Sequence, residues 1–322
     1  MQYTIPTIEN VKSAKDAIKK YINITPLINY PILDKILDAE VWIKHENFQI
    51  LGSFKVRGGL NYGTYLKKPT LSSVLITPST GNHGQSIAYA AKIFGYKSII
   101  CCPIGINPSK IQSMENLGAQ VISEGNNYDE SKSNAQELAE INGYTYVDGA
   151  NEDKLIAGVA TYSLEIFDKL NDPDFIIVPL GAGSGASGAC IVRNGLNKQT
   201  EIIAVQSSES PAGYLSWKNK KLTESKSNSK CEGLATGQGY ELPQSILKEH
   251  LNDFILVDEK KIFSAMKLFL FNTKSLVESA GASTLAAAIE LKQRIKGKKV
   301  VLIASGGNAS VNNLIKALES SI

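Results

Sequence analysis

Lys55 has neighbours that suit its side chain to chemistry with carbonyl compounds. It follows the polar pair Gly52-Ser53 and precedes a run of apolar residues with helical spacing. We therefore expect Lys55 in the first turn of a helix that Ser53 caps. The positive field at a helix start, together with partial burial, favours the neutral amine that Schiff-base formation needs. Taken alone, the same residue also fits an exposed lysine at a helix start.

A second polar segment, at residues 79–83, follows an apolar run that is typical of a buried strand and precedes a helical pattern. Backbone N–H groups at a helix start, with nearby hydroxyl and amide groups, favour binding of a carboxylate. The alternative is plain helix capping by a hydroxyl. The segment comprises Ser79, Thr80, Gly81, Asn82 and His83.

A third segment, the glycine-rich residues 181–188, also lies between a strand-like run and a helical run. Its glycines allow successive amides to converge on an anion, and phosphate is the natural ligand. The string GSGASG also matches the dinucleotide pattern GxGxxG, but the next strand ends in Gln206 instead of an acidic residue. No GK[ST] sequence follows, which excludes a nucleotide-triphosphate loop.

The elements that must position these segments alternate along the chain, which predicts parallel sheets covered by helices. We expect an α/β protein with two domains, each with a mostly parallel sheet flanked by helices. Residues 1–72 and 151–322 form the large cofactor-binding domain, and residues 73–150 form the small substrate-gripping domain. The predicted strands are 41–45, 74–77, 98–102, 120–122, 175–180, 202–205 and 300–304, and the predicted helices are 8–21, 85–94, 109–117, 129–140, 154–170 and 283–294.

The composition is that of an ordinary globular protein, with 43% hydrophobic and 20% charged residues among 322. The net charge of +3 gives no reason to expect a nucleic-acid partner. No segment approaches the ~18 apolar residues of a membrane span, so we expect no membrane partner and a cytoplasmic location. The four cysteines lack metal-ligand spacing, which predicts buried core residues and no metal site.

Five motifs in order resemble the fold-type-II pyridoxal-phosphate enzymes, in the branch of threonine/serine dehydratases and serine racemases. The likeness runs from Thr25 to Asn308 and implies a tryptophan synthase β-like fold. The motifs are ENFQ…GSFKxRG at 46–58, STGNHGQ at 79–85, GAGSG at 181–185, CEGLA at 231–235 together with VESAGA at 277–282, and SGGN at 305–308.

This resemblance implies that pyridoxal 5'-phosphate is the cofactor and that Lys55 is both its covalent anchor and the catalytic base. It also implies that the segment 79–83 binds the substrate carboxylate through Ser79, Thr80, Gly81, Asn82 and His83. Ser305 would meet the ring nitrogen as a neutral partner, which suits elimination better than transamination. Glu278 would be a partly buried carboxylate near the ring, with a solvated helix-end glutamate as the alternative. The implied cofactor-binding residues are Lys55, Phe54, Asn82, Gly181, Ala182, Gly183, Ser184, Gly185, Gly233, Glu278 and Ser305.

The expected activity is therefore dehydration of L-threonine or L-serine to 2-oxobutanoate or pyruvate plus ammonia. Racemisation is an alternative, although Thr80 replaces the serine that serine racemase uses as an acid/base. A lyase for another β-hydroxy amino acid, such as 3-hydroxyaspartate, is a second alternative. A nicotinamide-dependent oxidoreductase and a non-catalytic amino-acid sensor are more distant ones. By the same resemblance we expect a homodimer whose ligand is a small amino-acid substrate.

Overall fold

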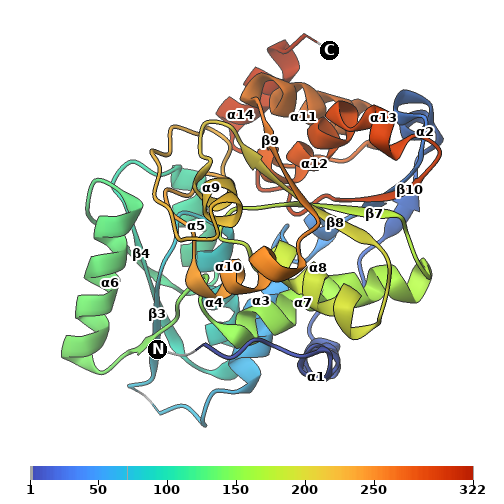
Figure 1. The fold of residues 1–322 in the computed structure, drawn as a ribbon. Helices are drawn as coiled ribbons and strands as arrows, with labels where there is room; N and C mark the ends of the chain where they lie inside the picture. Colours follow the sequence, from blue (N-terminus) through green and yellow to red (C-terminus); the bar gives the residue numbers. More distant parts are fainter. Residues whose placement is uncertain (1–2, 71, 322) are drawn as a thin grey trace.

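The computed structural model describes residues 3–70 and 72–321, in which two sheets carry the fold (Figure 1). One sheet has six strands in the order β1-β2-β10-β7-β8-β9, and the other has four in the order β5-β4-β3-β6. Residues 1, 2, 71 and 322 belong to the ranges predicted for the large domain and lie outside the described part. Helices flank both sheets, as the alternation of strands and helices predicts.

In the six-stranded sheet, every pairing is parallel except that of the edge strand β1 with β2. Helices cover both faces, so its inner strands are buried along their length. In β7, Ile176 and Val178 pack with residues of α7 and α8, whereas Phe175 and Ile177 pack with residues of α11 and α12. The strands are β1 (Leu27–Asn29), β2 (Glu40–Lys44), β7 (Phe175–Pro179), β8 (Glu201–Ser207), β9 (Asp253–Val257) and β10 (Lys299–Ile303), and the helices are α7 (Asp153–Lys169), α8 (Ser184–Gly195), α11 (Glu259–Thr273) and α12 (Ser279–Glu290).

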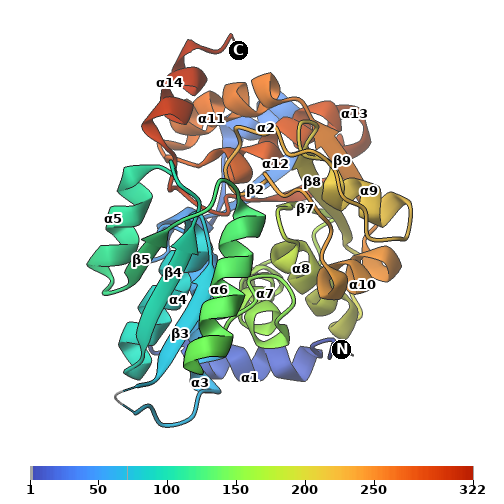
Figure 2. The same cartoon turned by 90° about the vertical axis from the view of Figure 1, so that its left-hand side faces the viewer.

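The four-stranded sheet is parallel throughout and lies beside the larger one, with α6 across its outer face (Figure 2). Leu75 of β3 packs against α4, and its neighbours Val74 and Ile76 pack against α6. This alternation is the period of two that a strand imposes. The elements are β3 (Val74–Pro78), β4 (Lys97–Cys102), β5 (Gln120–Ser123), β6 (Thr145–Tyr146), α4 (Asn82–Phe94), α5 (Pro108–Asn116) and α6 (Tyr128–Asn142).

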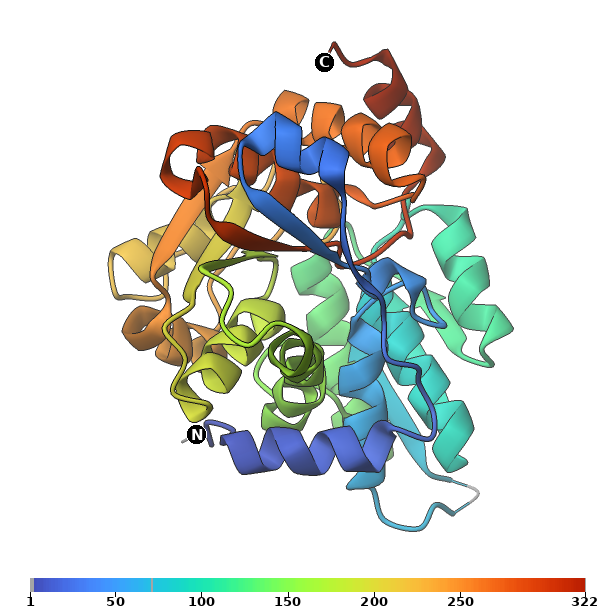
Figure 3. The same cartoon turned by 90° about the vertical axis from the view of Figure 1, so that its right-hand side faces the viewer.

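The N-terminal helix α1 lies across one end of the molecule against α7 and α3 (Figure 3). None of the helices among residues 3–70 and 72–321 is long and apolar enough to cross a membrane. The remaining helices are α1 (Ile8–Ile18), α2 (Pro31–Leu37), the 3-10 helix η1 (Glu46–Phe48), α3 (Lys55–Thr64), α9 (Ala212–Lys218), α10 (Glu241–His250), α13 (Lys292–Ile295) and α14 (Val311–Glu319).

All seven predicted strands are present, but β1, β6 and β9 were not predicted. β1 and β6 are too short to show the alternation of apolar and polar residues that is typical of a strand. They are defined by their pairing with a neighbouring strand. The helix predicted over 283–294 is wrong at both ends. The observed helix, α12, begins earlier, at Ser279, and ends at Glu290. A separate short helix, α13, follows, and its Ile295 is buried. The four cysteines are free and buried, as predicted.

Candidate active site

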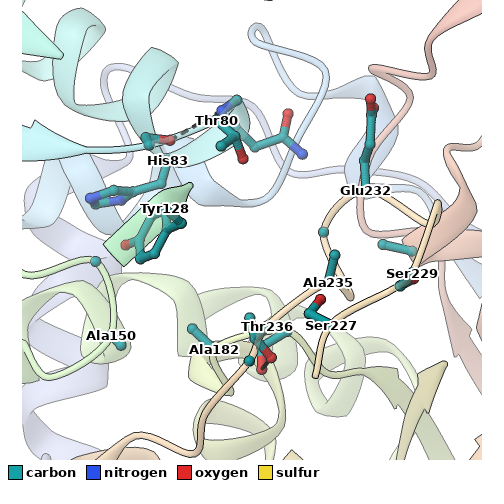
Figure 4. Close-up of a pocket in the computed structure, with 18 of the residues that line it drawn as sticks. Thr80, His83, Tyr128, Ala150, Ala182, Ser227, Ser229, Glu232, Ala235 and Thr236 are labelled. Atoms are coloured by element: carbon teal, nitrogen blue, oxygen red, sulfur yellow. Dashed lines mark hydrogen bonds between the residues drawn. The ribbon is translucent and has the colours of Figure 1, made fainter. Parts of the chain in front are cut away.

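A cavity of about 1010 Å³ lies between the two sheets, at the carboxyl ends of their strands. Parallel sheets present ligand sites at this edge because the strand-to-helix loops converge there. Thr80, from the loop before α4, and His83, in the first turn of α4, face Ala182 and Thr236 across the cavity (Figure 4). Three segments singled out from the sequence therefore meet in one place, since Lys55 lines the same cavity.

Lys55 is the first residue of α3, which confirms the predicted helix start. The predicted cap is wrong, because Phe54 occupies the N-cap position. Ser53 still supports the turn, since its hydroxyl accepts a hydrogen bond of 3.4 Å from the Lys55 N–H. The Lys55 ammonium donates to the Ser184 hydroxyl at 3.0 Å. Lys55 is half-buried, so the exposed-lysine alternative is wrong, and burial lowers the pKa of its amine to about 8, which makes the neutral form more accessible than in an ordinary lysine.

The glycine-rich loop joins β7 to α8 and contributes Gly181, Ala182, Gly183, Ser184 and Gly185 to the cavity wall. Helix α8 begins at Ser184, so the N–H groups of its first turn lack partners within the helix. Gly183 has a φ of 104°, which a residue with a side chain rarely adopts. This arrangement suits an anion held by backbone donors.

The loop before α4 is held by Ser79, whose hydroxyl accepts bonds from Gly81 N–H (3.2 Å) and Gly84 N–H (2.8 Å). These bonds hold the turn that leads into α4, whose N-cap residue is Gly81, and they leave the role of Ser79 in substrate binding a prediction. Thr80 is exposed to the cavity. His83 shares a 2.9 Å hydrogen bond with Thr77, and burial lowers the pKa of its imidazole to about 3, so the ring is neutral.

Asn82 connects this loop to the other side of the cavity. Its amide donates a 2.9 Å hydrogen bond to Glu278 and accepts one of 2.8 Å from Asn308. Glu278 is 4% exposed, and burial raises the pKa of its carboxyl group to about 7. The solvated alternative for Glu278 is therefore wrong, and the buried interpretation is confirmed.

Gly233 and Ser305 close the cavity beside Lys55. Gly233 has a φ of 85°, and a Cβ on Gly181 would lie 2.2 Å from the Gly233 carbonyl oxygen. The two loops thus touch through their backbones, which requires glycine at Gly181. Ser305 follows β10, and its carbonyl oxygen accepts a 3.1 Å hydrogen bond from Phe54 N–H. This bond holds the start of α3 against the end of β10.

A buried ion cluster beneath Lys55 was not predicted from the sequence. Arg57 donates to Glu46 at 2.7 Å and to Glu165 at 2.7 Å, and Lys44 is paired with Glu165. These four side chains are at most 6% exposed, and their charges cancel. One signal in the sequence could have indicated this cluster: Lys44 is a charged residue at the end of an apolar strand. The cluster ties α3, and with it Lys55, to β2 and α7.

Lys110 and Glu232 were also missed as site residues, although both line the cavity. The Lys110 ammonium of α5 meets the Glu232 carboxylate at 2.5 Å. Tyr128, at the start of α6, is a third missed lining residue (Figure 4). The sequence around Lys110 has the polar character of a surface helix, so no local pattern marks it.

The residues present fit pyridoxal phosphate. A desolvated lysine suits attachment of a carbonyl group, and the start of α8 suits a phosphate. Gly181 and Gly233 are in close contact, so at these two positions the cavity is lined by backbone atoms instead of side chains. Such a site suits an α/β enzyme that uses a phosphorylated carbonyl cofactor. A family model described as "Pyridoxal-phosphate dependent enzyme" matches residues 18–306, and the chain belongs to this family.

Individual relatives agree with this assignment. The chain is 32% identical to the L-threonine ammonia-lyase of Thermotoga maritima, over 98% of this chain and 79% of that protein. It is 33% identical to the serine racemase of Dictyostelium discoideum, over 97% of this chain and 98% of that protein. A solved threonine deaminase, from T.th., superposes with a TM-score of 0.89 at 28% identity, covering 95% of this chain and 99% of that one. The predicted tryptophan synthase β-like, two-sheet fold is confirmed.

Proposed function

We propose that the protein is an L-threonine/L-serine ammonia-lyase that uses pyridoxal 5'-phosphate. The reaction eliminates water from the amino acid, and hydrolysis of the released enamine takes one water back and frees ammonia, giving 2-oxobutanoate or pyruvate. Relatives named L-threonine ammonia-lyase and L-threonine dehydratase support this activity. The observation that carries the proposal is the half-buried Lys55, whose pKa lies near 8 and whose amine faces the start of α8.

We assign the cofactor phosphate to the loop of Gly181, Ala182, Gly183, Ser184 and Gly185. Lys55 would anchor the cofactor as a Schiff base. The ring would lie among Phe54, Asn82, Gly233, Glu278 and Ser305. All of these residues line the cavity, which is the geometric support for the assignment. When bound, the cofactor supplies an electron sink for charge that develops at the substrate Cα.

The chain's own residues would bind the substrate and move its proton. The loop of Ser79, Thr80, Gly81, Asn82 and His83 receives the carboxylate, with Thr80 offering its exposed hydroxyl. Neutral Lys55 takes the proton from Cα as a general base, which its lowered pKa favours near neutral pH. The β-hydroxyl group then leaves as water, with a proton supplied near the proposed phosphate site, which completes the elimination.

A serine racemase is the second candidate, and the position of Thr80 supports it. Its hydroxyl lies in the cavity on the loop that would hold the substrate, where a second proton carrier could act. A lyase for 3-hydroxyaspartate remains a third candidate. A nicotinamide-dependent oxidoreductase is set aside because the chain belongs to the pyridoxal-phosphate family.

The test is an absorption spectrum of the cofactor-loaded protein, followed by addition of L-threonine and an assay for 2-oxobutanoate. We expect visible absorbance that changes with L-threonine, together with keto-acid release. Lys55→Ala should fold but lose both signals. A spectral response without keto acid would redirect the proposal to racemisation, which chiral analysis of serine measures. Lys55→Ala with full turnover would overturn it.

We also propose a homodimer, a cytoplasmic location and a division into a small domain of residues 73–150 and a large domain of residues 1–72 and 151–322. The family resemblance supports the dimer, and the separate four-stranded sheet supports the domain division. The location is the one expected from the sequence. Light scattering of the purified protein tests the dimer, and cell fractionation tests the location. Limited proteolysis at the segments near residues 72 and 150 tests the domain division.

A further inference from the structure

The loop proposed to bind the substrate carboxylate carries no positive charge of its own. His83 is neutral, because burial lowers the pKa of its imidazole to about 3. The Ser79 hydroxyl accepts hydrogen bonds from two backbone N–H groups and can offer a carboxylate only a neutral O–H, and the Asn82 amide is bonded to Glu278 and Asn308. An incoming carboxylate would thus gain hydrogen bonds from this loop without a counter-charge. Burying a carboxylate is costly unless an opposite charge offsets the lost hydration.

Lys110 supplies a cation at the required place. Its ammonium lies 3.4 Å from the position that a Cβ on Gly81 would occupy, which puts it in contact with the middle of the loop. The Lys110 side chain is 12% exposed, so its charge is only weakly screened by water. Among the described residues that line the cavity, the other lysines are Lys55 and the exposed Lys226.

Glu232 holds this ammonium from the opposite side of the cavity, at 2.5 Å. The Glu232 side chain is 34% exposed, so its carboxylate can be rehydrated at little cost when it loses its partner. The four-carbon stem of a lysine lets the ammonium turn from one oxygen acceptor to another. The pair therefore keeps Lys110 neutralised and positioned while the substrate is absent.

We propose that Lys110 is a substrate-binding residue that exchanges Glu232 for the α-carboxylate of the amino acid. This inference rests on the proposed function, since it takes the loop at residues 79–83 as the carboxylate site. Lys110 would add an ion pair to the neutral donors of the loop. Glu232 would compete with the substrate for the same ammonium and so set how tightly a carboxylate binds.

The alternative is that the ion pair is a simple strap between α5 and the loop at Glu232. The two interpretations predict different changes in carboxylate binding when one charge of the pair is removed. If the pair is a strap, removing either charge has the same effect on binding. If Lys110 exchanges partners, Lys110→Met weakens carboxylate binding, whereas Glu232→Gln strengthens it by removing the competitor.

The experiment titrates the cofactor-loaded protein with L-threonine and with L-threoninamide and follows the visible absorbance. The amide lacks the negative charge but keeps the rest of the molecule. We expect Lys110→Met to reduce the preference for the acid over the amide by about tenfold or more, the usual effect of losing a charge-assisted hydrogen bond. Lys110→Arg should keep most of the preference. Lys226→Met removes an equivalent charge from the same cavity and should leave the preference unchanged.

Three results would overturn the inference: an unchanged preference in Lys110→Met, an equal loss in Lys226→Met, or weaker binding of L-threonine in Glu232→Gln. Cofactor absorbance and circular dichroism identify any variant that fails to fold. If Lys110→Met fails to fold, Glu232→Gln carries the test, because stronger binding of L-threonine is expected only if Glu232 competes with the substrate. If the wild-type protein binds L-threonine but releases no 2-oxobutanoate, the proposed reaction fails while the preference remains measurable. A wild-type protein that responds to neither ligand overturns both proposals.

Discussion

The ammonium group of Lys55 donates a 3.0 Å hydrogen bond to the hydroxyl group of Ser184, which links the first residue of α3 to the first residue of α8. The N-termini of α3 and α8 therefore lie close together. The positive end of each helix dipole disfavours the protonated form of Lys55. Desolvation acts in the same direction on the amine. The site is thus arranged for a neutral Lys55 and a bound anion.

The pH dependence of cofactor binding should report the pKa of Lys55. Only the neutral amine reacts with a carbonyl group, and burial lowers the pKa of Lys55 to about 8. We expect the rate of cofactor capture by the cofactor-free protein to rise with pH, to reach half of its maximum near pH 8 and to level off above about pH 9. Stopped-flow absorbance between about pH 6.5 and pH 9.5 measures this rate. A rate that keeps rising past pH 9 would show an ordinary lysine, with a pKa near 10.4.

Ser184→Ala should weaken cofactor binding by about tenfold, because it removes a hydroxyl from the proposed phosphate site and from Lys55. Ser187→Ala is the matched control. Ser187 lies one turn later in α8, where its hydroxyl approaches the Pro243 carbonyl oxygen at 3.5 Å. Equilibrium titration with pyridoxal phosphate gives both dissociation constants. Equal effects of the two substitutions would contradict the assignment of Ser184.

Glu278→Gln should change how the stability of the cofactor-free protein depends on pH. Burial raises the pKa of Glu278 to about 7 from 4.5, so the folded protein holds an extra proton between these values. The free energy of unfolding therefore falls as pH rises through this window, by up to about 3 kcal/mol. Glutamine cannot lose that proton, so the variant should gain stability relative to wild type between about pH 5 and pH 8.

Urea unfolding of both proteins at the two pH values measures this difference. The wild type supplies the control at each pH, so that other titrating groups cancel. A difference between variant and wild type that is the same at both pH values would mean that Glu278 titrates normally.

Gly181→Ala should prevent the close contact of the two cofactor loops. The new Cβ would lie 2.2 Å from the Gly233 carbonyl oxygen, so the backbone must shift. We expect a loss of about 1–3 kcal/mol in stability, as for overpacking, and a clear loss of cofactor affinity. Gly237→Ala is the control, since its Cβ would lie 3.4 Å from the nearest atom, the Ser225 carbonyl oxygen. Thermal unfolding measures the stability of both variants, and titration with pyridoxal phosphate measures their cofactor affinity.

The stability of the protein should depend on the charge balance within the buried ion cluster. Glu165→Gln leaves Lys44 and Arg57 with one carboxylate, so it should cost about 3–5 kcal/mol. Adding Lys44→Met to that variant should recover part of the loss, because the remaining charges balance again. The half-exposed pair of Arg294 and Glu201 is the control, and Glu201→Gln should cost less than about 1 kcal/mol. Chemical denaturation measures all three, and a double variant no more stable than Glu165→Gln would contradict the balance.

The sequence by itself determined the alternation of strands and helices, and with it the class of fold. Hydrophobic periodicity is local, so the strands at 74–77 and 175–180 and the helices after them could be predicted. Local patterns also identified Lys55 and the glycine-rich loop, because a helix start creates an anion site from a few consecutive residues. The family motifs then added the proposed roles of Asn82 and Ser305, both of which line the same cavity.

Only the tertiary structure decided what depends on burial and on contacts between distant residues. The raised pKa of Glu278 follows from packing that its neighbours in sequence do not reveal. The ion pair of Lys110 with Glu232 joins residues 122 positions apart. Lys44 and Glu165 are 121 positions apart, and no local pattern indicates that the two side chains form a pair. Long-range electrostatic contacts and desolvation are properties of the folded molecule, which is why the sequence could not supply them.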